Sequence, residues 1–103
     1  MEENDILIGK IYNYWDRGIH TEDKRYDVLI IDKIPFEKSD KSIIKQWEQE
    51  KKDCYWLYAK KTNFFIKGVI DLGEKKEEVY FVKTQDNRWF SIGWWSGRLE
   101  EKD

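Results

Sequence analysis

His20 is the side chain best suited to acid–base chemistry, because it is the single histidine of the chain and imidazole titrates near neutral pH. A catalytic histidine needs an orienting carboxylate, and Asp16, Glu22 and Asp23 lie close to it in the sequence. Nothing in this segment marks a nucleophile, however, and a loop histidine beside acids is ordinarily only solvated. We therefore expect no catalytic role for His20 and favour a protein that is not an enzyme.

Two further candidates for chemistry have simpler structural interpretations. Cys54 follows Lys51 and Lys52, which would make its thiol more reactive, but we favour a small buried residue at a helix–strand junction. Asp71 and Glu78 can form a carboxylate pair across a turn, although charged residues commonly flank surface turns. No spacing matches a zinc site or a phosphate-binding glycine loop, so we expect no metal and no cofactor.

The aromatic segment Arg88–Gly97 gives a stronger signal, because it holds three of the six tryptophans, with Trp94 and Trp95 adjacent. Neighbouring residues of a strand point to opposite faces, so one sheet face cannot bury both rings. We model the preceding turn as the two residues Asp86 and Asn87, which suit a tight hairpin. One face of this hairpin is then apolar and is predicted to be core; it carries Val79, Phe81, Phe90, Ile92 and Trp94.

The opposite face of the hairpin is the predicted binding site. Trp89 and Trp95 flank the small residue Ser91 there and form a shallow trough. The predicted partner-binding residues are Trp89, Trp95, Tyr80, Ser91, Glu78, Glu100 and Glu101. In the alternative interpretation, a second layer from the N-terminal strand, with Tyr12, Tyr14 and Trp15, covers the trough and makes it ordinary core.

Aromatic anchors beside carboxylates suit a basic protein partner, because the rings supply buried contacts and the acids steer the encounter. We expect a small cytoplasmic protein-interaction module, most concretely an inhibitor or immunity-type protein that occludes a basic surface of its partner. The alternative is a small-ligand module that stacks a sugar or a nucleotide between Trp89 and Trp95. The two differ in shape, since a ligand site is concave and preformed.

Length and composition set the remaining limits. The chain has 103 residues, so we expect one domain spanning 1–103. Its formal net charge of -2 argues against general nucleic-acid binding, which requires a basic surface. No apolar run approaches the length of a membrane span, and residues 1–10 are acidic and unlike a signal peptide, which favours the cytoplasm.

The elements that must position these residues follow from hydrophobic periodicity. Strands are predicted at Asp5–Trp15, Arg25–Asp32, Cys54–Ala59, Phe64–Leu72, Glu78–Thr84 and Arg88–Trp95, and a helix at Ser39–Asp53. The unbroken run Val28–Ile31 suggests a strand buried on both faces. Ile43, Ile44 and Trp47 form the apolar stripe of the helix. The order ββαββββ predicts an α+β fold with a mainly antiparallel, curved sheet and the helix on one face, or a barrel-like closure of that sheet.

Overall fold

The computed structural model describes residues 6–16, 24–54, 58, 64–92 and 97–102. These residues form six strands, one α-helix and a short 3₁₀ helix. In chain order the elements are β1 (Ile11–Asp16), β2 (Lys24–Pro35), η2 (Phe36–Lys38), α1 (Lys41–Asp53), β3 (Phe64–Asp71), β4 (Lys76–Lys83), β5 (Trp89–Ser91) and β6 (Gly97–Glu100). The predicted α+β class and the order ββαββββ are confirmed.

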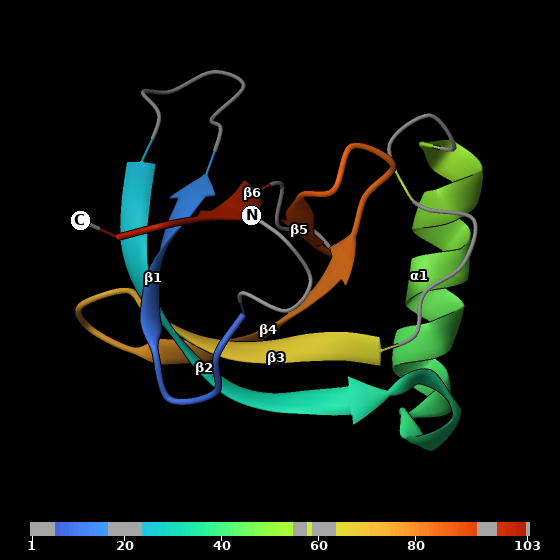
Figure 1. Ribbon diagram of the computed structural model, residues 1–103, viewed down its shortest axis with the longest axis horizontal. Helices are drawn as coiled ribbons and strands as arrows, with labels where there is room; N and C mark the ends of the chain where they lie inside the picture. Colours follow the sequence, from blue (N-terminus) through green and yellow to red (C-terminus); the bar gives the residue numbers. More distant parts are fainter. Residues whose placement is uncertain (1–5, 17–23, 55–57, 59–63, 93–96, 103) are drawn as a thin grey trace.

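The six strands form a closed antiparallel barrel (Figure 1). Each strand pairs with its neighbours in the sequence, and β1 also pairs with β6, which closes the sheet. The barrel-like closure is therefore the form that the sheet takes. Closure pairs strand edges that an open sheet would leave exposed. In Figure 1, α1 stands beside the barrel on the side away from β1.

Successive strand residues point alternately into the barrel and out of it, which divides the apolar residues into two clusters. In β4, for example, Phe81 lies in the barrel interior and Val82 lies outside, below α1. The barrel interior contains Ile6, Tyr12, Tyr14, Val28, Ile30, Ile66, Ile70, Val79, Phe81, Trp89 and Leu99. The helix-side cluster contains Trp47, Tyr58, Phe65, Val82 and Ile92.

The helix docks through the predicted stripe. Trp47 is buried, Ile43 and Ile44 are half-buried, and all three belong to or pack against the helix-side cluster. The ring of Trp47 meets Phe36 and Phe65 edge-on, at centroid distances of 5.7 and 6.3 Å. The residues predicted to face water, Lys45, Glu48 and Lys52, are exposed. None of the helices in the described part of the chain is long and apolar enough to cross a membrane.

Three strand predictions differ from the structure. The first strand begins at Ile11, so residues 6–10 of the predicted strand Asp5–Trp15 are not strand. Cys54 ends α1 and Tyr58 makes an isolated bridge to Thr84, while the other residues of the predicted strand Cys54–Ala59 lie outside the described residues. The sixth strand is instead Gly97–Glu100, in the acidic tail. Its pairing with β1 buries Leu99 in the barrel interior, which compensates for an otherwise polar sequence.

Candidate functional site

The hairpin that joins β4 and β5 differs by one residue from the predicted register. Phe81 lies opposite Ser91 and Lys83 opposite Trp89, so the loop comprises the three residues 85–87 rather than Asp86 and Asn87 alone. Asn87 adopts a left-handed conformation with φ 63°, as the last residue of such a loop commonly does. Because side chains alternate along a strand, this one-residue shift changes which residues of β4 and β5 lie side by side on the same face of the sheet.

The prediction of an open trough is therefore wrong for Trp89, its predicted wall, and for Ser91, its predicted floor. Trp89 and Ser91 are each 1% exposed, and Trp89 packs in the barrel interior beside Phe64 with ring centroids 5.6 Å apart. Tyr12 and Tyr14 belong to the same interior cluster as Trp89, as the alternative predicted, whereas Trp15 lies under Arg98 and Arg25 and Trp95 is outside the described residues. Neither a protein surface nor a sugar can reach Trp89 in this fold.

A small polar group sits inside the barrel where β1, β5 and β6 meet. The hydroxyls of Tyr14 and Ser91 are 2.9 Å apart, and Ser91 Oγ also accepts a hydrogen bond from the Gly97 backbone N–H at 3.2 Å. Burial raises the pKa of the Tyr14 hydroxyl, and the hydrogen bond to Ser91 partly offsets this. These contacts hold the closing strand β6 against the interior, which is a structural role.

Replacing Gly97 by Ala should weaken barrel closure. A Cβ at Gly97 would stand 2.6 Å from the Tyr14 hydroxyl and 2.5 Å from the backbone oxygen of Trp15, closer than atoms pack. The backbone atom cannot move without disturbing the pairing of β1 with β6. We expect the free energy of unfolding to fall by about 1–3 kcal/mol in a urea titration. An unchanged denaturation midpoint would show that β6 is held less tightly than its contacts indicate.

The other predicted partner-binding residues are dispersed over the barrel. Tyr80 is half-buried against the helix-side cluster. Glu78 is exposed on β4 and forms an ion pair with Lys67, and this hydrogen bond raises the pKa of the Lys67 amine. Glu101 pairs with Lys10 at 3.1 Å. Since these carboxylates are already paired and lie apart, they do not form one site.

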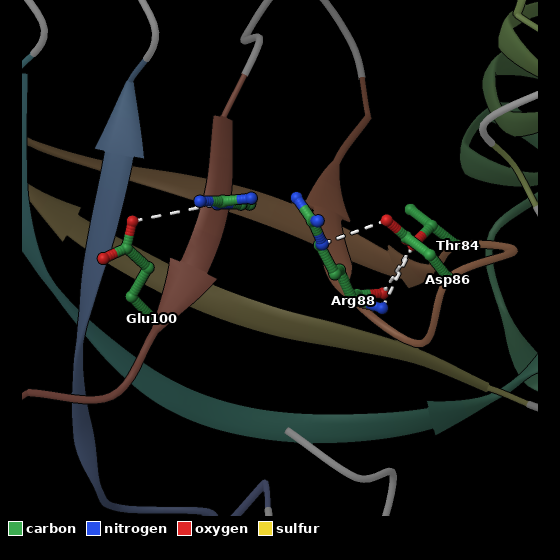
Figure 2. Close-up of polar contacts among 5 residues, drawn as sticks. Thr84, Asp86, Arg88 and Glu100 are labelled. Carbon is green, nitrogen blue, oxygen red and sulfur yellow. Dashed lines mark hydrogen bonds and ion pairs between the residues drawn. The ribbon is translucent and has the colours of Figure 1, made fainter.

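Glu100 belongs to a cluster of arginines around Trp15. Its carboxylate lies 3.7 Å from Nε of Arg98 and 3.8 Å from Nε of Arg25. The two guanidinium groups lie over the Trp15 ring, at 4.2 Å for Arg98 and 5.8 Å for Arg25. Figure 2 shows the Glu100 carboxylate contacting one guanidinium group. The charge of Glu100 is thus compensated within the chain.

The β4–β5 loop carries a second polar group, also drawn in Figure 2. Asp86 accepts a hydrogen bond from the Thr84 hydroxyl and pairs with Arg88 Nε at 3.0 Å. The Arg88 backbone N–H donates in turn to Thr84 Oγ1 at 3.1 Å. This network fixes the three-residue loop, so it explains the register and requires no ligand.

Strands β1 and β2 and the turn before β1 carry the large apolar residues that are exposed in the described part of the chain. Leu29 and Ile31 of β2 are 40% and 39% exposed, so the prediction that Val28–Ile31 is buried on both faces is wrong: only Val28 and Ile30 point inward. The exposed large hydrophobic residues of the described chain are Leu7, Ile8, Ile11, Leu29 and Ile31. We call this set the outer apolar face.

Strand pairing and a backbone hydrogen bond link the segments that carry these five residues. Ile11 lies opposite Leu29 in the β1–β2 pairing. The turn that carries Leu7 and Ile8 is tied to β2, because the Gly9 N–H donates to the Ile30 carbonyl at 2.7 Å. Scattered exposed apolar residues are ordinary on a protein surface, but a contiguous set marks an interaction site.

A shallow hollow of about 230 Å³ lies within this face. It is lined by Ile11, Asp27, Leu29, Val69, Asp71 and Lys76. Strand pairing arranges these residues as two rows across β1 to β4: the apolar row is Ile11, Leu29 and Val69, and the polar row beside it is Asp27, Asp71 and Lys76. Lys102 reaches over from the C-terminal segment and pairs with Asp27 at 2.6 Å.

Sequence reasoning missed this site. Asp71 was considered only as one half of a carboxylate pair, but it lies opposite Lys76 while Glu78 lies opposite Val69, so the two acids are not directly across from each other. The available signal was the run Val28–Ile31, in which no polar residue alternates with the apolar ones. Such a run indicates either two buried faces or one buried face and one interface.

Several predictions fall on residues that the structure does not describe. Trp95, predicted to bind the partner, Trp94, predicted to be core, and the loop residue His20 all lie outside the described residues. Cys54 is a half-buried free thiol at the end of α1, where it packs against the helix-side cluster. In the part of the chain that the structure describes, no group of three His, Cys, Asp or Glu residues is arranged to hold a metal ion.

The architecture is that of a small closed β-barrel with one helix and an exposed apolar set on one side. Comparisons of the chain with models of protein families, with curated proteins and with solved structures give no significant match. The function is therefore argued from the surface itself.

Proposed function

We propose that this protein is an interaction module that binds a partner protein through its outer apolar face and blocks a basic surface of that partner, as an inhibitor or immunity-type protein does. The observation that carries the proposal is the exposure of Leu7, Ile8, Ile11, Leu29 and Ile31, of which Ile11 and Leu29 lie side by side on paired strands. The barrel is filled from within and covered by α1 on another side, so this face adds little to the monomer's own core.

Burial of this face would supply binding free energy. Complete burial of one exposed leucine or isoleucine is worth about 1.5–3 kcal/mol. Leu7 and Ile8 are 55% and 59% exposed, so each retains roughly half of that amount for a partner. Several such side chains on one rigid sheet face make a preorganised surface, which lowers the entropy cost of association.

Acidic residues border this face and favour a basic partner. Asp27 and Asp71 line the hollow beside the apolar row. The chain has 21 acidic residues against 19 lysines and arginines, so its overall charge also favours a basic surface. We place the protein in the cytoplasm, where the thiol of Cys54 would stay reduced.

The size of the hollow argues against the small-ligand alternative. Sites for small molecules commonly measure about 300–1,000 Å³ and enclose most of the ligand. The hollow measures about 230 Å³ and lies on an exposed sheet face. The aromatic stacking surface on which that alternative depended has lost Trp89 to the barrel interior.

Replacing Leu29 by Glu should weaken partner binding strongly while leaving the fold intact. Leu29 is 40% exposed at the centre of the face, so the change should alter the free energy of unfolding by only about 0.5–1 kcal/mol. Loss of a central interface contact should cost about 2 kcal/mol or more, roughly thirtyfold in Kd. The partner would be captured from the native host on immobilised protein, identified by mass spectrometry, purified and titrated by calorimetry.

Gln46→Glu provides the matched control, because Gln46 is exposed on α1 and the substitution adds the same charge. It should bind the purified partner as the unaltered protein does. Equal affinity of Leu29→Glu would contradict the proposal. A concentration-dependent dimer of the unaltered protein that Leu29→Glu dissolves, seen by analytical ultracentrifugation, would assign the face to a second copy of this chain and would also contradict it.

A further inference from the structure

We propose that the hollow on the outer apolar face receives a single long cationic side chain, a lysine or an arginine, from the partner protein. The inference rests on the proposed function and specifies the chemistry of its central contact. The geometry that carries it is the apolar row lying beside the polar row, with its two carboxylates, in one hollow.

The two rows match the two parts of a cationic side chain. Lysine and arginine bury a stem of methylene groups along apolar surface while the charged head remains near polar groups. Ile11, Leu29 and Val69 offer that apolar surface across three neighbouring strands. Asp27 and Asp71 lie opposite each other in the adjacent row, where the head of such a side chain would arrive.

The volume favours one side chain over a larger group. The hollow of about 230 Å³ falls below the range of pockets that enclose whole small molecules. The hollow is not a packing defect of the core, because two residues of its apolar wall, Ile11 and Leu29, are 46% and 40% exposed. A side chain carried by a docked protein would fill the hollow while the surrounding apolar residues make the wider interface.

A lysine of the chain itself, Lys102, already pairs with one of the two carboxylates of the hollow. Lys102 Nζ contacts Asp27 Oδ1 at 2.6 Å, which shows that the carboxylate can bind an amine approaching over β1. The two side chains are 41% and 51% exposed, and exposed ion pairs contribute little to stability. A cation of the partner can therefore replace Lys102 at small cost.

The remaining charges determine how selective the hollow is. Lys76 lies opposite Asp71 and lines the cavity, so its charge opposes an incoming cation. Asp71 accepts a hydrogen bond from the Gly73 N–H at 2.9 Å, which fixes the carboxylate in place. Exchange of Lys102 for a partner's cation leaves the local charge unchanged, whereas an anionic side chain would face two carboxylates.

The test uses small probes and needs no partner. The ¹⁵N-labelled protein would be titrated with butylguanidinium and butylammonium, and separately with butanol and butyrate, while amide shifts of Leu29, Val69 and Asp71 are followed by NMR. We expect saturable shifts with the two cations and much weaker ones with butanol and butyrate. Equal shifts with butanol would reduce the hollow to an unselective apolar depression, and absence of shifts with the cations would overturn the proposal.

Two variants sharpen the result. Asp71→Asn keeps the oxygen that accepts from Gly73 and removes the charge, so cation affinity should fall about three- to fivefold, the range of an exposed ion pair. Lys102→Ala removes the competing amine and should strengthen cation binding by a similar factor. A merely structural role of Asp71 would leave probe affinity unchanged. Asp86→Asn on the β4–β5 loop is the charge-matched control.

Failure of this inference is distinguishable from failure of the proposed function. If a captured partner binds through Leu29 but no cationic probe enters the hollow, the interface stands and its central contact is different. If the probes bind but Leu29→Glu retains the partner, the hollow accepts a cation and the partner docks elsewhere.

Discussion

Replacing Trp89 by Ala should lower the free energy of unfolding by about 3–5 kcal/mol. The indole is 1% exposed and lies in the barrel interior against Phe64, so its removal leaves a cavity that a closed sheet cannot collapse to fill. A loss of this size is a large part of the about 5–15 kcal/mol that stabilises a typical domain. Guanidinium titration followed by far-UV circular dichroism measures it.

Two controls separate the role of Trp89 from general sensitivity of the hairpin. Trp89→Phe keeps an aromatic ring and removes the indole N–H, which is buried with no acceptor among the described residues, so it should lose far less stability. Arg88→Ala removes an exposed ion pair with Asp86 and should change the free energy of unfolding by at most about 1 kcal/mol. A Trp89→Ala variant as stable as Arg88→Ala would contradict the burial of this indole in the barrel interior.

The order of elements was predictable because it depends on periodicity within each segment. The stripe Ile43, Ile44 and Trp47 defines a helical face by itself, and the structure buries that face as predicted. Closure of the barrel was not predictable in the same way. It depends on β6, whose polar sequence contains one buried apolar residue, Leu99, and becomes a strand only through pairing with β1.

The register of the β4–β5 hairpin shows why the predicted site failed. Turns 86–87 and 85–87 both end at Asn87, which tolerates the left-handed conformation, so local turn chemistry permits either. The contacts of Thr84 with Asp86 and Arg88 select the longer loop. A shift of one residue exchanges the faces of a strand, and it placed Trp89 inside the barrel.

The outer apolar face illustrates the opposite problem. Leu29 and Ile31 stand in an apolar run, and hydrophobicity alone predicts that such residues are core. Only the topology shows that β2 is covered on its inner face and open on its outer face at these positions. Residues that are apolar without serving the core are therefore the observation on which the proposed function rests.

Replacing Trp47 by Ala should detach α1 from the barrel and cost about 3–5 kcal/mol of the free energy of unfolding. Trp47 is the buried residue of α1. Its ring packs edge-on against Phe36 of η2 and against Phe65 of β3. An isolated helix of 13 residues is marginal in water, so α1 depends on this docking for its own stability. Helix loss should accompany the drop in stability.

Glu48→Lys is the control for this prediction, because Glu48 is exposed on the adjacent position of the same helix. Its free energy of unfolding should change by less than about 0.5 kcal/mol. Hydrogen exchange distinguishes local from global effects: in Trp47→Ala the α1 amides should exchange faster than those of β2 and β3, whose mutual pairing does not involve the helix. Equal denaturation midpoints for the two variants, or equal acceleration of exchange in α1 and in the barrel, would contradict a helix that docks as a separate layer on a closed barrel.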